Sequence, residues 1–343
     1  MIDILTHIYN HTPNGTLALL RTNKQWYQYY PNYIGNDEAQ RLPDITLKDV
    51  IKNNWREVIY CIPNEDITFK QFTLAAMFGR TEMLKYFIKI EKYNGTDTAI
   101  FSAAIHGHLN VVEYLHENNM GRCDLSAMNY ASGNGHLEMV QWLHHNIHEG
   151  SVDMAMDMAA KNGHLHIVQW LHHNRTEGCT VRAMDWASEN GHLEMVEWLH
   201  TYRTEGCTTK AMNLAAKNGH LEMVQWLHTY RTEGCTVRAM DWASENGHLE
   251  MVEWLHTYRT EGCTEDAMDW AAQCGYLETV EWLHTYRNEG CTHWAMEWAV
   301  MVGNLEMVEY LHTHRNESNI HMSIITAERY NQSLIYDYLI QFV

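Results

Sequence analysis

The sequence has few prolines, few basic residues and no long apolar run. Only four of its 343 residues are proline, and none follows Pro63. This shift in composition marks the first part of the chain as a separate N-terminal module. Lysine and arginine total 24 against 43 acidic residues, so the formal net charge is −19. Because an acidic surface repels phosphate backbones, we expect no nucleic-acid partner.

No apolar segment approaches the roughly 18 residues that a membrane span requires, and the opening MIDILTHIYNHT has no basic region. We therefore expect a soluble intracellular protein of the cytoplasm, with no membrane partner.

Eight cysteines are present, and five of them recur every 28 residues: Cys179, Cys207, Cys235, Cys263 and Cys291. Packed helices lie roughly 8–10 Å apart, whereas a disulfide needs Cβ atoms about 3.8 Å apart. The recurring cysteines are predicted to be reduced, packed thiols.

Internal repetition dominates the sequence. The stretch AMDWASENGHLEMVEWLHTYRTEGCT occurs at Ala183–Thr208 and again, identically, at Ala239–Thr264, with a near copy at Ala211–Thr236. A glycine recurs at the same place in nine units: Gly79, Gly107, Gly135, Gly163, Gly191, Gly219, Gly247, Gly275 and Gly303. Since repeats stack in one dimension, the length of this chain counts repeats and not domains.

One unit illustrates the predicted local structure. Ala183–Glu189 is predicted to form a short helix, and Asn190–Gly191 a turn, because glycine takes the left-handed conformation that ends helices. A second helix is expected over His192–Tyr202, with apolar residues on two faces, as in a helix packed between neighbours. TEGCT closes the unit.

The unit resembles the ankyrin repeat. The pattern A-M-D-x-A-A-x-N-G-H-L-E-x-V-x-W-L is similar to that family's helix–turn–helix consensus over residues 71–322, and closest to the 28-residue arrays of giant DNA viruses and some protists. The resemblance implies a helical solenoid that binds a protein on its concave face, in the host cytoplasm if the protein is viral. Two features depart from the family. Alanine replaces its proline at Ala183, and about five residues are missing from its usual 33, so the protruding β-hairpin should be shortened to a turn.

The predicted architecture is an all-α solenoid with a small helical module in front. Residues 1–42 form that module, 43–70 a degenerate repeat, 71–322 nine regular repeats and 323–343 a capping half-repeat, with Asn331 in the place of the glycine. Terminal repeats that lack the motif are typical of capping units, so we expect a monomer.

The N-terminal module resembles an F-box. IDILTHIYNH…TLALLRTNKQWYQ is similar to that motif, although it lacks the leading Leu-Pro and has a longer loop. The resemblance implies docking on the Skp-type linker of a cullin ubiquitin ligase. The residues expected to make that contact are Ile4, Leu5, Ile8, Leu17, Leu20, Trp26 and Tyr27. The alternative is a cap that covers the first apolar face of the solenoid.

Repeated polar and aromatic residues are interpreted as scaffold. Histidines recur after the turn glycine (His192, His220) and at the end of the second helix (His200, His228), too far apart to share a metal ion, so we predict no metal and no cofactor. Identical carboxylates in identical environments cannot supply a catalytic pair, and no phosphate loop or nucleophile motif occurs, so we predict no enzyme. Arg203–Glu205 and its copies are expected to be ion pairs that tie loops together.

The recurring second-helix tryptophans and methionines, such as Trp198 and Met195, are interpreted as core packing.

Positions that differ between otherwise constant units are the candidate partner-binding residues. They lie two residues before the turn glycine and directly after GCT, on the first-helix side of the unit. The set is Lys161, Arg182, Glu189, Lys210, Lys217, Arg238, Glu245, Asp266, Gln273 and Trp294. Neutral drift is the alternative for each residue. Trp294 is the strongest candidate, because exposed tryptophans anchor interfaces.

The sequence therefore predicts a non-catalytic protein-binding scaffold, with a role as substrate receptor of a ubiquitin ligase if the F-box-like segment works. Two alternatives stay open: a simple binding or masking protein, and a self-assembling array.

Overall fold

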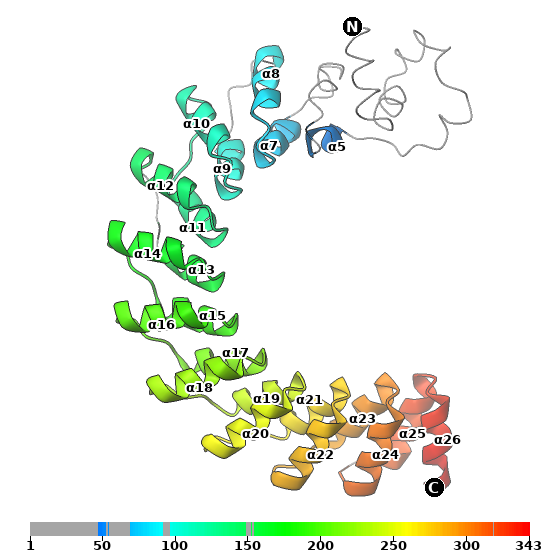
Figure 1. Cartoon of the computed structure of the whole chain (residues 1–343). Helices are drawn as coiled ribbons and strands as arrows, with labels where there is room; N and C mark the ends of the chain where they lie inside the picture. Colours follow the sequence, from blue (N-terminus) through cyan, green and yellow to red (C-terminus); the bar gives the residue numbers. More distant parts are fainter. Residues whose placement is uncertain are drawn as a thin grey trace, which may run out of the picture. The chain divides into compact units, whose positions relative to one another are not determined.

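The computed structural model describes residues 47–52, 54, 69–91, 97–148, 152, 154–317 and 319–343 (Figure 1). The F-box-like segment therefore lies outside the described residues. The chain divides into two compact units, Met1–Ala155 and Met156–Val343. All regular structure in the described residues is helical, and no strand occurs among them, which confirms the all-α prediction.

The described part of unit 1 contains three pairs of helices preceded by a short helix. Its helices are α5 (Leu47–Lys52), α7 (Phe69–Met77), α8 (Thr81–Glu91), α9 (Asp97–Ile105), α10 (Leu109–Glu117), α11 (Ser126–Gly133) and α12 (Leu137–Asn146).

Unit 2 continues the same alternation, from α13, which starts at the last residue of unit 1. Its helices are α13 (Ala155–Lys161), α14 (Leu165–Asn174), α15 (Val181–Glu189), α16 (Leu193–Tyr202), α17 (Thr209–Lys217), α18 (Leu221–Tyr230), α19 (Arg238–Glu245), α20 (Leu249–Tyr258), α21 (Asp266–Cys274), α22 (Leu277–Tyr286), α23 (His293–Val302), α24 (Leu305–His314), α25 (Ile320–Arg329), α26 (Ser333–Leu339) and the 3-10 turn η2 (Ile340–Phe342).

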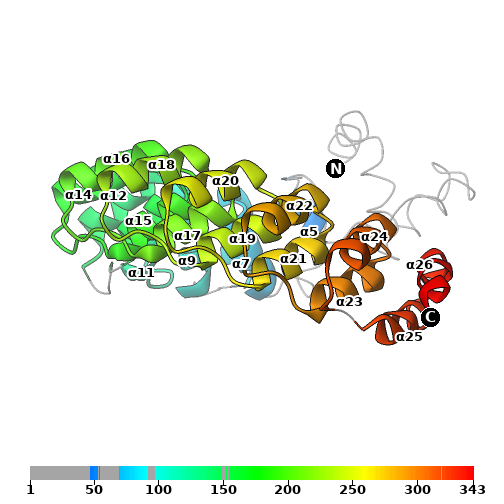
Figure 2. The same cartoon turned by 90° about the horizontal axis from the view of Figure 1, so that it is seen from below.

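The first helices of successive repeats in unit 2 pack directly against one another, α15 on α17, α17 on α19 and α19 on α21. The second helices form a separate row, which lies along the upper side of the view in Figure 2. Neighbouring second helices contact each other less than neighbouring first helices do. The closer spacing makes the first-helix row the concave side of unit 2. Its exposed surface is therefore the inner face on which ankyrin-like scaffolds are expected to bind.

The core repeats as regularly as the sequence. Ala183, Met184 and Ala187 of the first helix and Met195, Val196 and Leu199 of the second are each at most 2% exposed, and their counterparts in the other regular repeats are similarly buried. The predicted turn is also present, with Gly191 at φ +72°. Asn331 takes the glycine conformation as predicted, at φ +56°. The segment predicted as a half-repeat contains two helices, α25 and α26.

Candidate partner-binding surface

A buried aspartate fixes the start of four first helices in unit 2, α15, α17, α21 and α23. The amide and hydroxyl of Thr208, at the start of α17, both donate to the carboxylate of Asp185 in the preceding first helix, α15, at 2.8 Å each. The same hydroxyl accepts the amide of Lys210 and so caps α17. Asp157, Asp241 and Asp269 bond in the same way to Thr180, Thr264 and Thr292. Each of these four helices is thereby held in register with the one before it.

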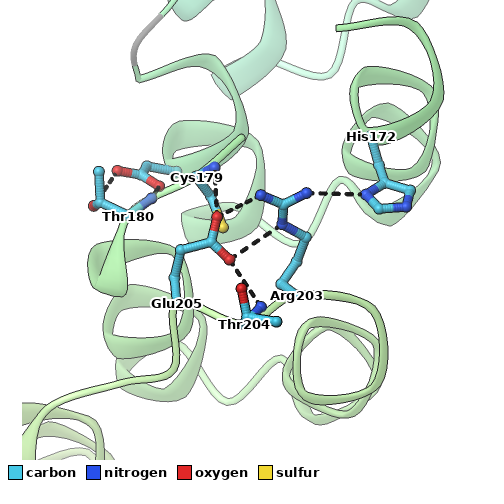
Figure 3. Close-up of polar contacts among 7 residues, drawn as sticks. His172, Cys179, Thr180, Arg203, Thr204 and Glu205 are labelled. Carbon is cyan, nitrogen blue, oxygen red and sulfur yellow. Dashed lines mark hydrogen bonds and ion pairs between the residues drawn. The ribbon is translucent and has the colours of Figure 1, made fainter. Parts of the chain in front are cut away.

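An arginine clamp joins consecutive loops and is shown in Figure 3. Arg203 Nε donates to Glu205 Oε2 at 3.2 Å, Nη2 pairs with Oε1, and Nη1 lies 3.2 Å from Nδ1 of His172 in the preceding repeat. Glu205 also accepts the amide of Cys179 at 3.4 Å, again from the preceding repeat. The arrangement recurs at Arg231, Arg259 and Arg287. The predicted ion pairs are therefore confirmed, and they tie neighbouring repeats together.

Burial and charge shift the pKa values of groups at the clamp. Burial raises the pKa of Cys179 and Cys207 to about 12, so these thiols are not nucleophiles at neutral pH. Burial alone would raise the pKa of Glu205, but the hydrogen bonds that Glu205 accepts from Arg203 lower this pKa to about 2. The seven described cysteines are free thiols.

The histidine after each turn glycine also has a structural role. His108 Nε2 lies 2.8 Å from the carbonyl oxygen of Met77 in the preceding repeat. His220 packs over Gly191, where a Cβ atom would lie only 2.8 Å from the ring. Burial lowers the pKa of His108, His192 and His248. Nowhere in the described ranges do three metal-binding side chains come together.

The second-helix tryptophans were predicted to be core residues, and this prediction was wrong. Trp198, Trp226 and Trp254 are half-buried, because each ring lies at the surface between two repeats. His172 meets the Trp198 ring edge-on, with ring centres 5.3 Å apart, and Tyr202, on the same helix as Trp198, lies tilted against that ring at 5.0 Å. The methionine prediction was right, since Met195, Met223 and Met251 are buried.

Three columns of side chains cover the exposed face of the first helices in unit 2; we call them the first-helix stripe. Residues spaced i, i+4 and i+7 share one helix face, so α15, α17, α19, α21 and α23 each contribute one residue to each column, and α13 adds Lys161 to column 3. Column 1 is Arg182, Lys210, Arg238, Asp266 and Trp294; column 2 is Trp186, Leu214, Trp242, Trp270 and Trp298; column 3 is Lys161, Glu189, Lys217, Glu245, Gln273 and Met301. All ten residues predicted to bind a partner lie in columns 1 and 3.

Column 2 was missed by the sequence reasoning. Trp186 and Trp242 are half-exposed, and each lies between two cations. Lys161 and Arg182 lie 5.5 and 5.8 Å from the Trp186 ring centre, and Lys217 and Arg238 each 5.6 Å from that of Trp242. The i+4 spacing from Arg182 could have placed Trp186 on the stripe. It was overlooked because a repeated tryptophan suggests packing.

A model of the ankyrin-repeat family matches residues 72–154, 128–209, 156–238, 184–266 and 240–324. The chain belongs to the ankyrin-repeat family. Its ankyrin repeats make it a protein–protein interaction scaffold, and the family is generally non-catalytic. The protruding β-hairpin of the family is shortened to a turn in unit 2, where the TEGCT loops contain no strand. No curated protein matches the sequence. In the part of the chain that the structure describes, no helix is long and apolar enough to span a bilayer.

Proposed function

We propose that the first-helix stripe of unit 2 binds a protein partner. The observation that supports this proposal is the contrast between buried and exposed positions of the same helices. Ala183, Met184 and Ala187 recur unchanged at Ala239, Met240 and Ala243, whereas columns 1 and 3 carry basic, acidic, amide and apolar side chains in turn. Packing does not dictate residues that point into solvent, so the variation can encode a partner.

We further propose, from the F-box-like residues 1–30, that the protein acts as a substrate receptor. In this proposal the N-terminal helices dock on the Skp-type linker of a cullin ubiquitin ligase while the stripe holds the target. The role needs both parts of one chain, so each part has its own test.

Co-precipitation tests the receptor role. The intact chain should bring down the linker protein, and a variant with Leu5→Asp and Leu20→Asp should not, because both leucines belong to the predicted docking helices. Loss of the linker should leave capture of the target unchanged. If the intact chain fails to bind the linker, the receptor role is wrong and the binding scaffold alone remains.

Deletion of residues 1–42 separates the receptor from a masking protein. A receptor loses its effect on the level of the bound target, whereas a masking protein keeps its cellular activity. Urea unfolding of the truncated chain is the control, since an N-terminal cap would also stabilise the repeats.

A further inference from the structure

Column 1 of the first-helix stripe carries three cations in a row, followed by an acid and then an aromatic residue. Arg182, Lys210 and Arg238 come from α15, α17 and α19, Asp266 from α21 and Trp294 from α23. All five side chains are exposed, Trp294 at 44%. Column 1 therefore presents three positive charges, one negative charge and one aromatic ring in succession along the surface of unit 2.

The three cations are not held in ion pairs within the described residues, although the charge of Arg182 acts on the buried carboxyl of Asp157. None of Arg182, Lys210 and Arg238 forms an ion pair there, whereas Arg203, Arg231 and Arg259 of the clamps all do. Arg182 and Arg238 rest on tryptophan rings, which orient a guanidinium without cancelling its charge. The three cations can therefore pair with carboxylates of a partner protein.

The position of the cations also opposes the helices' own electrostatics. Arg182 and Lys210 stand second in α15 and α17, and Arg238 begins α19. The helix dipole favours acids in the first turn and disfavours cations. In a chain with 43 acidic and 24 basic residues, three consecutive cations at such positions favour a role in binding over one in stability.

Resting on the proposed function, we propose that column 1 binds an extended acidic segment of the partner. Packed helices are roughly 8–10 Å apart and an extended chain advances about 3.3–3.6 Å per residue, so carboxylates about three residues apart would meet successive helices. Asp266 repels a fourth carboxylate and favours a basic residue, and Trp294, stacked on Trp298 at 5.4 Å, receives an apolar side chain. The recognised pattern is Glu-x-x-Glu-x-x-Glu-x-x-Lys-x-x-Leu, read in either direction. In column 3 the glutamates Glu189 and Glu245 alternate with Lys161 and Lys217, so only column 1 offers three successive cations to an acidic segment.

Fluorescence anisotropy with a labelled peptide of this pattern, x being Gly or Ser, tests the proposal. The peptide should bind at least about tenfold more tightly than the same peptide with Gln for Glu, and the difference should vanish in 1 M NaCl, where the Debye length is about 3 Å. The variant Arg182→Glu/Lys210→Glu/Arg238→Glu should lose this preference. The control variant Arg329→Glu, in the first helix α25, should keep it.

Two further measurements test whether the triple variant is still folded and whether charge decides which peptide binds. The triple variant should unfold at no lower urea concentration than the parent, because glutamates suit the first helical turn and Asp266 already occupies this column. Asp266→Arg should gain affinity for the peptide in which Glu replaces Lys. Equal binding of the Glu and Gln peptides, or a triple variant that still prefers Glu, would overturn the proposal. So would tighter binding of single-stranded oligo-dT through the same three cations.

Panning a random-peptide library on the intact chain separates this inference from the proposed function. Enriched acidic peptides that no longer bind the triple variant support both. Enriched peptides without acidic residues that are lost when Trp186, Trp242 and Trp294 are replaced by Ala contradict only the acidic partner. Peptides that bind independently of the stripe contradict both.

Discussion

At the scale of the residue, the buried aspartates of the first helices combine two opposing effects. Asp241 accepts the amide of Thr264 at 2.7 Å and its hydroxyl at 3.0 Å, yet burial raises the pKa of its carboxyl. Asn213 holds the same place in another repeat, where it accepts the Thr236 amide and donates to the Thr236 hydroxyl, both at 2.9 Å. The contact between Asn213 and Thr236 is therefore an uncharged version of the bridge that Asp241 forms with Thr264.

We predict that Asp241→Asn keeps or raises the urea midpoint at pH 7, whereas Asp241→Ala lowers stability by about 1–3 kcal/mol, because the Thr264 donors lose their partner. A raised folded pKa means that the folded state binds the proton more tightly, so this group's contribution falls as pH rises from 3.8 through the folded pKa. The gain from Asp241→Asn should therefore be larger at pH 7 than at pH 4. Asn213→Asp is the matched control and should show the opposite change; equal effects of Asn and Ala at position 241 would refute the bridge.

At the scale of the element, the arginine clamp needs a glycine in the loop that it covers. Gly234 has φ +71°, and a Cβ atom there would lie 2.7 Å from Nη2 of Arg259 in the next repeat. Two independent reasons therefore require glycine: the left-handed backbone and the close guanidinium.

We predict that Gly234→Ala lowers the free energy of unfolding by about 1–3 kcal/mol. A double-mutant cycle with Arg259→Ala checks the cause, because part of the loss should disappear once the guanidinium is gone. Gly275→Ala is the matched control: its φ is +84°, but the nearest atom, Asn304 Nδ2, is 3.2 Å away. Strict additivity of Gly234→Ala and Arg259→Ala would leave backbone strain as the only cause.

Helix positions in unit 2 were predictable within two or three residues, because the local signals agree. The glycine turn and the apolar spacing predicted Ala183–Glu189 and His192–Tyr202, against the observed Val181–Glu189 and Leu193–Tyr202. Thr180 as N-cap went unrecognised because it was assigned to the TEGCT loop as its last residue, and only the fold brings Asp157 to it. One repeat lacks the residues that form the arginine clamp and the threonine cap in unit 2. Near the end of unit 1, Ile147 stands in the place of the clamp arginine and Val152 in that of the capping threonine.

At the scale of the whole molecule, repeated histidines make stability depend on pH. Nδ1 of His172 and His284 lies 3.2 and 3.3 Å from Nη1 of Arg203 and Arg315, so each ring nitrogen must accept and the imidazole must be neutral. Burial, followed by the arginine charge, lowers the pKa of both histidines.

A depressed histidine pKa stabilises the fold above the unfolded pKa of 6.5, and the contribution is lost as pH falls towards the folded pKa. We predict that the urea midpoint falls between pH 7.5 and pH 5.5. His172→Gln keeps an acceptor that does not titrate, so it should flatten this dependence, and combining it with His284→Gln should flatten it further. An unchanged pH slope in the double variant would contradict the assignment.

The last described repeat carries a charged side chain at a position that earlier repeats bury. Glu328 is exposed at the frame position where Ser188, Ala216 and Ser244 are fully buried against the next repeat, and Ile325 beside it is 49% exposed. We predict that Glu328→Ala increases concentration-dependent self-association in light scattering, because it removes the charge that opposes stacking on an apolar end face. Glu306→Ala, on an exposed second helix, is the control and should change nothing. A parent chain that already forms long oligomers would favour the self-assembling array.

The sequence by itself determined the period, the helix pair, the turn glycines, the family and the columns that vary, because each of these depends on local residue type and exact repetition. Only the tertiary structure decided which side chains meet across repeats. It placed Arg203 against His172, Asp185 against Thr208, and Trp186 between Lys161 and Arg182. Apart from Arg182 and Trp186, which lie four residues apart on α15, these contacts join residues 23 to 31 positions apart in the sequence. Their geometry follows from how the helices stack, and no local pattern specifies which residue of one repeat faces which residue of the next.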